Sequence, residues 1–139
     1  MIYSAQCAYA MRALTRLALT TPDGFVRLDE LCAGTEMPKH FVGKIFQELV
    51  RHGLLSSAKG RGGGFKLART PQDIALYEIV AIIDGTRKFE ECVVGLAQCD
   101  GTQPCPLHDE WSQIRSRIEL YLMDTTLEQI TRASKKQSS

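Results

Sequence analysis

The chain has 139 residues, of which 44% are hydrophobic and 24% charged, a balance that excludes a disordered or fibrous protein. The formal net charge is only +1, yet residues 1–71 carry ten Lys or Arg against five Asp or Glu, while residues 72–139 carry seven against eleven. The first part is therefore suited to a polyanion, and the second to protein or water.

No secretory signal and no apolar run of membrane-spanning length is visible in the sequence, so we expect a cytoplasmic protein without a membrane partner. Five cysteines in a reducing compartment indicate metal or redox chemistry rather than a disulfide framework.

The first part of the chain predicts a helix-turn-helix. An opening helix capped by Ser4 ends at Pro22-Asp23-Gly24, an extended piece covers 25–27, and a short helix follows with Leu28, Leu31 and Cys32 inward. After a turn at 34–37, Pro38 suits the first position of a second amphipathic helix that Gly53 ends. Its expected buried face consists of Phe41, Val42, Ile45, Phe46 and Leu49.

Two short strand-like runs, at 54–58 and 65–68, flank a glycine-rich turn and predict a β-hairpin wing. Glycine lets such a turn approach a DNA groove closely, and cations at its tip reach phosphates. We also place Ser4, at the start of the chain, in the predicted DNA-binding set: Ser4, Lys39, His40, Lys44, Arg51, Lys59, Arg61 and Gly62.

The second part predicts a helix over about 76–84, a cysteine-containing loop, a long helix from about Leu107 and a short last helix opened by a Thr125–Glu128 capping box. The tail, 134–139, is expected to be disordered. The long helix has an apolar stripe with little left in the chain to pack on, so we expect it to meet a second copy. The predicted homodimer interface consists of Trp111, Ile114, Ile118, Tyr121 and Leu122.

The loop holds Cys92, Cys99, Cys105 and His108, with six, five and two residues between successive members. Soft ligands in a Gly- and Pro-rich loop suit zinc or an iron–sulfur cluster, whereas the alternative is a set of buried or free thiols. Zinc sites usually have closer, paired spacings, which counts against zinc, but on ligand type alone zinc remains a serious alternative. We expect Cys32 to be a small buried hydrophobe.

Three blocks resemble the Rrf2 family of bacterial regulators. The first block is Ser4 with Tyr9-Ala10. The second runs from residues 38–41 to 52–55 and continues with 60–65. The third is the Cys/Cys/Cys/His set, which Trp111 follows three residues on. By its Cys/Cys/Cys/His pattern the chain resembles the IscR-like branch more than the NsrR-like one, although the first cysteine gap is one residue longer and Gly43 replaces an acidic residue.

The resemblance implies a mainly α fold with a small β-wing, namely a winged helix-turn-helix domain (1–72) followed by a linker helix, the cluster loop (92–108) and a long dimerisation helix (together 73–133). It also implies a non-enzymatic regulator, most simply a repressor, that binds a pseudo-palindromic DNA operator and senses redox state, iron–sulfur status or nitric oxide. The implied cofactor is an iron–sulfur cluster, 2Fe–2S in preference to 4Fe–4S, with zinc as the alternative. Alternative functions are a thiol- or zinc-switched regulator without a cluster, and a small electron-transfer protein.

Overall fold

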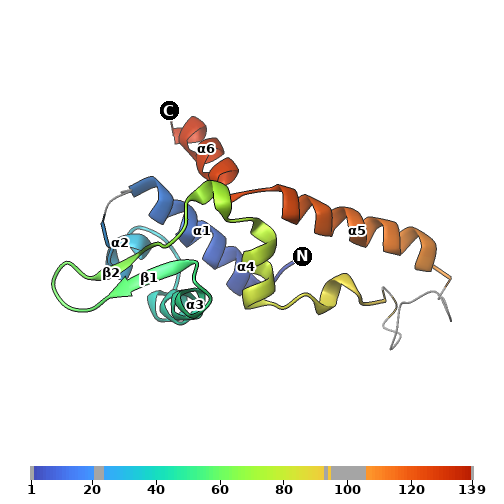
Figure 1. Cartoon of the computed structure of the whole chain (residues 1–139), viewed down its shortest axis with the longest axis horizontal. Helices are drawn as coiled ribbons and strands as arrows, with labels where there is room; N and C mark the ends of the chain where they lie inside the picture. The colour runs from blue at the N-terminus through green and yellow to red at the C-terminus, as the bar shows by residue number, and fades with distance from the viewer. Residues whose placement is uncertain (1, 21–23, 93, 95–105, 139) are drawn as a thin grey trace.

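The computed structural model describes residues 2–20, 24–92, 94 and 106–138, and it has one helical body from which a long helix extends (Figure 1). In chain order the elements are α1 (Ala5–Thr20), α2 (Leu28–Cys32), α3 (Lys39–Arg51), β1 (Leu55–Ala58), β2 (Gly64–Leu67), the 3₁₀ turn η1 (Pro71–Asp73), α4 (Leu76–Ile83), the 3₁₀ turn η2 (Arg87–Phe89), α5 (His108–Asp124) and α6 (Leu127–Ser138). Over the described ranges, the helices are too short or too polar to cross a lipid bilayer.

The helix-turn-helix forms as the apolar spacing predicts. On α3 the buried positions are Val42, Ile45, Phe46 and Leu49, but Phe41 is 39% exposed, which corrects the expected buried face. Pro38 takes the capping position just before α3, one residue earlier than predicted, because its ψ of 114° is extended rather than helical.

The predicted wing is confirmed as an antiparallel pair in which Leu55 faces Leu67 and Ala58 faces Gly64. The extended piece before α2 joins it: Val26 and Phe65 exchange both backbone hydrogen bonds, at 2.8 and 2.9 Å. The wing is therefore fixed at its base to the segment that leads into α2, and Figure 1 shows it projecting from the body beside α2 and α3.

One hydrophobic core holds the body together. The rings of Phe46 and Phe65 meet edge to face at 5.2 Å between centroids, which joins α3 to the wing. The same core includes Leu14 of α1, Ile79 of α4 and Leu127 of α6. It therefore includes residues on both sides of the domain boundary expected at 72–73, which does not separate two cores.

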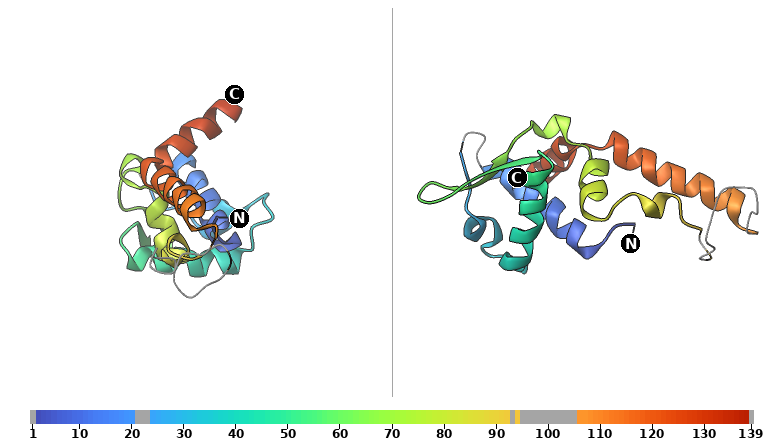
Figure 2. Two further views of the ribbon diagram at one scale, coloured as in Figure 1. Left: turned by 90° about the vertical axis from the view of Figure 1, so that its right-hand side faces the viewer. Right: turned by 60° about the horizontal axis from the view of Figure 1, so that its bottom comes forward.

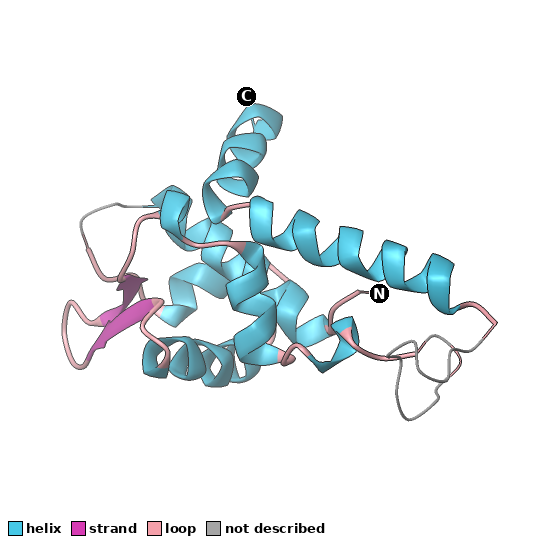
Figure 3. Ribbon diagram, turned by 45° about the vertical axis from the view of Figure 1, so that its right-hand side comes forward, coloured by secondary structure: helices cyan, strands magenta, loops and turns pink. Residues whose placement is uncertain are grey.

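The second part of the chain packs back onto the first. An isolated bridge between Ala75 and Thr126 holds the start of α4 against the α5–α6 junction, and α6 packs on α1. Most of α5 extends beyond the body, away from the wing (Figure 3), and α6 leaves at an angle to it (Figure 2).

The last helix differs from the prediction in two ways. Its capping box is Thr126 with Gln129, since each donates a backbone N–H to the other's side chain, at 2.8 and 3.3 Å. It also continues to Ser138, so most of the tail expected to be disordered is helical. Burial of Leu127 and Thr131 anchors its first turns, and no Gly or Pro interrupts residues 127–138.

Candidate nucleic-acid interface and cysteine loop

The outer face of α3 presents the cations that the sequence predicts. Lys39, His40 and Lys44 are exposed. Lys39 also pairs with Asp29 of α2, and this hydrogen bond lowers the pKa of the Asp29 carboxyl. The pair links the two helices of the motif across their turn, so Lys39 has a structural contact as well as a predicted DNA contact.

Arg51 lies at the other end of α3, where it pairs with Glu48 and lowers the pKa of that carboxyl. Its guanidinium stays exposed. An exposed pair of this kind contributes little to stability, because water screens it and two long side chains lose freedom. Arg51 therefore remains available for a phosphate.

The wing tip carries Lys59, Arg61 and Gly62, all exposed. Among the described residues, neither Lys59 nor Arg61 forms an ion pair, so their charges are uncompensated. The turn is tight, with the Gly63 N–H donating to the Gly60 carbonyl at 3.0 Å. A Cβ at position 63 would lie 2.4 Å from the Ala58 carbonyl oxygen, so only glycine fits.

Phe41 is a candidate contact that the periodicity missed. It lies in the first turn of α3, beside a shallow hollow of about 280 Å³ that Lys44 and Gln6 also line. Residues at the start of a recognition helix are those that reach base edges, and an apolar side chain there contacts a thymine methyl group. Counting only apolar spacing placed Phe41 on the buried face, because position 41 borders that face.

Ser4 makes contacts within the protein, and its predicted DNA contact remains a prediction. Its hydroxyl accepts a hydrogen bond from the Cys7 N–H at 3.1 Å and so caps α1, and it donates to the carboxylate of Asp84, eighty residues away. The side chain is half-buried and already engaged in the protein.

The cysteine loop begins at a buried residue. Cys92 is 7% exposed and follows Phe89, which is packed in the core. The Glu91 carbonyl accepts hydrogen bonds from Trp111 Nε1 at 2.9 Å and from an Arg115 guanidinium nitrogen at 3.1 Å. His108, half-buried, is the first residue of α5. The residue just before Cys92 is thus bonded to the N-terminal part of α5, where the loop also ends.

The remaining two predicted ligands, Cys99 and Cys105, lie outside the described residues. Within the described ranges, no three His, Cys, Asp or Glu side chains are grouped as a metal site would need. Cys92 borders a hollow of about 510 Å³ whose other lining residues include Trp111 and Arg115.

The two cysteines outside the loop are poor thiol switches. Cys7 is fully buried; burial first, and then the negative charge of Asp84, raise the pKa of its thiol to about 12. Burial also raises the pKa of Cys32, which packs against the core but is half-buried rather than buried as expected. Because the thiolate is the reactive form, both stay largely unreactive near neutral pH.

The predicted dimer surface on α5 is only partly exposed. Ile114 and Tyr121 are 43% and 62% exposed, whereas Trp111 and Ile118 are half-buried. Leu122 is 1% exposed and belongs to the chain's own core, so its assignment to the interface is wrong: α4 covers that side of α5. The sequence did not pick out Leu120 and Met123, which are also exposed.

Comparison with known proteins fits this geometry. A model of the Rrf2 family, described as an iron-dependent transcriptional regulator, matches residues 3–133. The chain belongs to the Rrf2 family.

Within this family the chain is 31% identical over 138 residues to an Aquifex aeolicus protein named among the HTH-type transcriptional regulators, covering 98% of this chain and 95% of the relative. It is 32% identical over 124 residues to the transcriptional regulator IscR of Photobacterium profundum, covering 89% and 72%. As a member of the Rrf2 family, it is a DNA-binding transcriptional regulator and not an enzyme.

Solved structures confirm the mainly helical winged fold. CymR, the global cysteine regulator of B. subtilis, superposes with a TM-score of 0.79 at 22% identity, over 94% of this chain and 95% of that one. T. potens IscR gives 0.78 at 21% identity, over 98% and 90%.

Proposed function

We propose that this Rrf2 regulator binds DNA under the control of an iron–sulfur cluster held by Cys92, Cys99, Cys105 and His108. The observation that carries the proposal is the fixed entry of the loop, where Cys92 is buried and the Glu91 carbonyl is bonded to α5 just after His108. Cys92 and His108 thus belong to segments that meet at one end of α5.

The donor set fits the cofactor. Three thiolates and one imidazole are ligands that suit iron–sulfur clusters, and the resemblance to the IscR-like branch favours 2Fe–2S over 4Fe–4S. When bound, the group supplies a centre that responds to oxidants, nitric oxide or iron supply, with a potential raised by histidine ligation. The chain's own contribution is to hold Cys92 out of water and to fix Glu91 on α5.

On the DNA side, α3 would enter the major groove while the wing contacts phosphates or the minor groove. Support comes from the exposed cations Lys39, His40 and Lys44, and from the uncompensated charges of Lys59 and Arg61. Two copies related by a two-fold axis would read a pseudo-palindromic operator, acting most simply as a repressor in the cytoplasm.

The dimer contact is assigned to the part of α5 that extends beyond the body. Ile114 and Tyr121 lie seven residues apart, two helical turns, and are exposed on one side of it. Large apolar side chains on an unsupported helix are stabilised when a second copy covers them.

Chemical analysis tests the cluster directly. Protein purified without oxygen should be coloured and contain iron with acid-labile sulfide. A colourless preparation loaded with zinc would replace this proposal by a zinc-switched regulator on the same scaffold. His108→Ala should change the absorption spectrum or the reduction potential, and a variant identical to the wild type in both would assign the fourth ligand elsewhere.

A further inference from the structure

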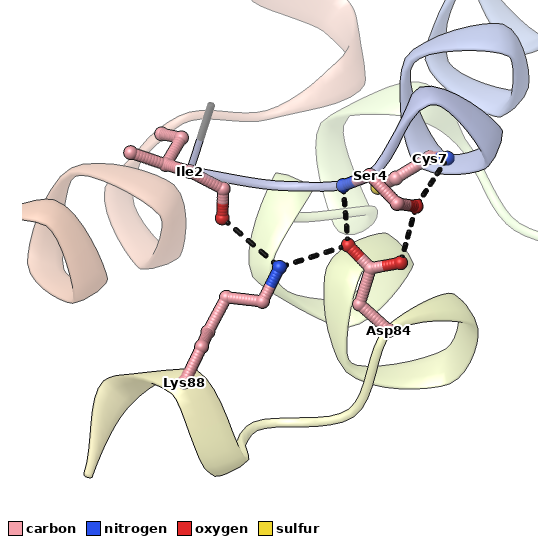
Figure 4. Close-up of polar contacts among 5 residues, drawn as sticks. All are labelled: Ile2, Ser4, Cys7, Asp84 and Lys88. Carbon is pink, nitrogen blue, oxygen red and sulfur yellow. Dashed lines mark hydrogen bonds and ion pairs between the residues drawn. The ribbon is translucent and has the colours of Figure 1, made fainter. Parts of the chain in front are cut away.

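A partly buried polar cluster joins the start of the chain to Asp84 and Lys88, which precede the Cys92 segment (Figure 4). Asp84, the residue after α4, accepts hydrogen bonds from the Ser4 N–H at 2.8 Å, from the Ser4 hydroxyl and from the Lys88 ammonium at 3.0 Å. Lys88 also donates to the Ile2 carbonyl at 3.1 Å. We call Ser4, Asp84 and Lys88 the Asp84 cluster.

This cluster differs from the surface pairs of the protein. The Asp84 side chain is 8% exposed, so its charge is mostly removed from water and must be compensated by its partners. Burial alone would raise the pKa of Asp84, yet the Ser4 hydrogen bonds and Lys88 together lower it. A buried carboxylate with three donors holds its neighbours firmly, because the loss of any donor leaves part of the charge unpaired.

One side of the cluster leads to the DNA-contacting helix. Ser4 caps α1 through the Cys7 N–H, and Gln6 in that first turn borders the hollow lined by Phe41 and Lys44 of α3. The position of the first turn of α1 therefore determines one side of this hollow, next to the end of α3 that is predicted to contact bases.

The other side leads to the cysteine loop. Lys88 lies in η2, directly before the buried Phe89 and four residues before Cys92. The Glu91 carbonyl, one residue before Cys92, is held by Trp111 and Arg115 of α5. Movement of the Cys92 segment therefore acts on α5 through Glu91 and on the Asp84 cluster through Lys88.

We propose that Asp84 is a positioning residue that couples the Cys92 segment to the first turn of α1, and through it to α3. The inference rests on the proposed function, in which the state of the loop controls DNA binding. When the Cys92 segment shifts, Lys88 withdraws from Asp84. The carboxylate then binds Ser4 differently, and the first turn of α1 changes its position beside α3. Coupling of this kind requires only that the two arrangements differ in DNA affinity.

DNA affinity of the two loop states tests the coupling. The protein with its iron–sulfur cluster and the protein without it are each titrated with a duplex that the wild-type chain selects from a random-sequence pool. The measured quantity is the ratio of the two DNA affinities. In Asp84→Asn and Lys88→Met this ratio should move about fivefold or more towards one. Iron and sulfide content should equal that of the wild type, because neither residue is a ligand.

The control is Glu78→Gln, which breaks the Arg69–Glu78 pair at the opposite end of α4, also 3.0 Å long. It should leave the ratio unchanged. If Asp84→Asn lowers both affinities by the same factor, Asp84 has a structural role only and the inference is overturned.

Measurements on the protein without its iron–sulfur cluster test the coupling independently of the cofactor. Lys88→Met should speed amide hydrogen exchange at Cys7, whose N–H is bonded to the Ser4 hydroxyl, by about tenfold. Asp84→Asn should shift the emission of Trp111, the one tryptophan of the chain. If the protein never contains iron yet both changes occur, the cofactor proposal fails and the coupling stands. If neither occurs, the coupling fails whatever the iron content.

Discussion

Gly64 lies where the wing meets the extended segment around Val26, and its backbone has a φ of +134°. A Cβ there would come within 2.3 Å of the Val26 carbonyl oxygen. Gly64→Ala should therefore cost about 2–4 kcal/mol of unfolding free energy, from backbone strain and the displacement of Val26. Urea denaturation measures it.

The matched variant is Gly60→Asn in the same wing. Its φ is +81°, but among the described residues nothing lies within 4 Å of the added Cβ, and asparagine tolerates that conformation. It should stay within about 1 kcal/mol of the wild type. Equal losses at the two positions would contradict the steric explanation.

Asp84 gives the molecule an acid-sensitive contact. Its pKa in the folded chain lies below the ordinary value of 3.8, so as the pH falls the unfolded chain takes up this proton first. The stabilisation is complete above the ordinary pKa and is lost as the pH falls through the lowered one. Asp84→Asn should therefore lose less stability than the wild type between about pH 6 and pH 3, measured by urea denaturation. Parallel pH profiles would contradict the prediction.

The helices and strands show how much of the fold the sequence pattern predicts. Apolar spacing and turn residues predict α3, the wing and α4 to within a residue or two. The pattern does not say what covers each stripe, so Leu122 was assigned to a partner although α4 covers it. Nor does it reveal the Ser4–Asp84 contact, because a pairing across eighty residues leaves no local periodicity. Half of the predicted ligand set lies outside the described residues, and all four ligand assignments remain predictions.

The exposed charge at the wing tip leads to a prediction about the salt dependence of DNA binding. Arg61 is exposed at its tip and, over the described ranges, has no acidic partner. If it contacts a phosphate, Arg61→Ala should reduce the slope of log affinity against log salt by about one unit, measured on random-sequence duplex DNA. Arg132→Ala removes another exposed charge, on α6, where Glu128 pairs with it, and should leave the slope unchanged. An unchanged slope in Arg61→Ala would remove the phosphate contact.

The whole molecule is a DNA-binding body with a protruding helix, and the two parts need a second copy for different reasons. The body presents one α3 and one wing, enough for half of a two-fold operator. The protruding part of α5 exposes apolar side chains that a monomer leaves in water. One association through α5 would meet both needs, because it pairs the two bodies and covers the helix.

The double variant Ile114→Glu, Tyr121→Glu should therefore be monomeric, since two buried carboxylates per chain would lose their hydration in the interface. Light scattering should give twice the chain mass of 15.5 kDa for the wild type and 15.5 kDa for the variant. Affinity for the selected duplex should fall together with the mass, whereas helix content should not change, because both side chains are exposed in the monomer. Ser116→Glu adds a charge on the opposite side of α5 and should remain dimeric. If the double variant stays a dimer, the copies associate through another surface, such as the exposed Leu120 and Met123 side.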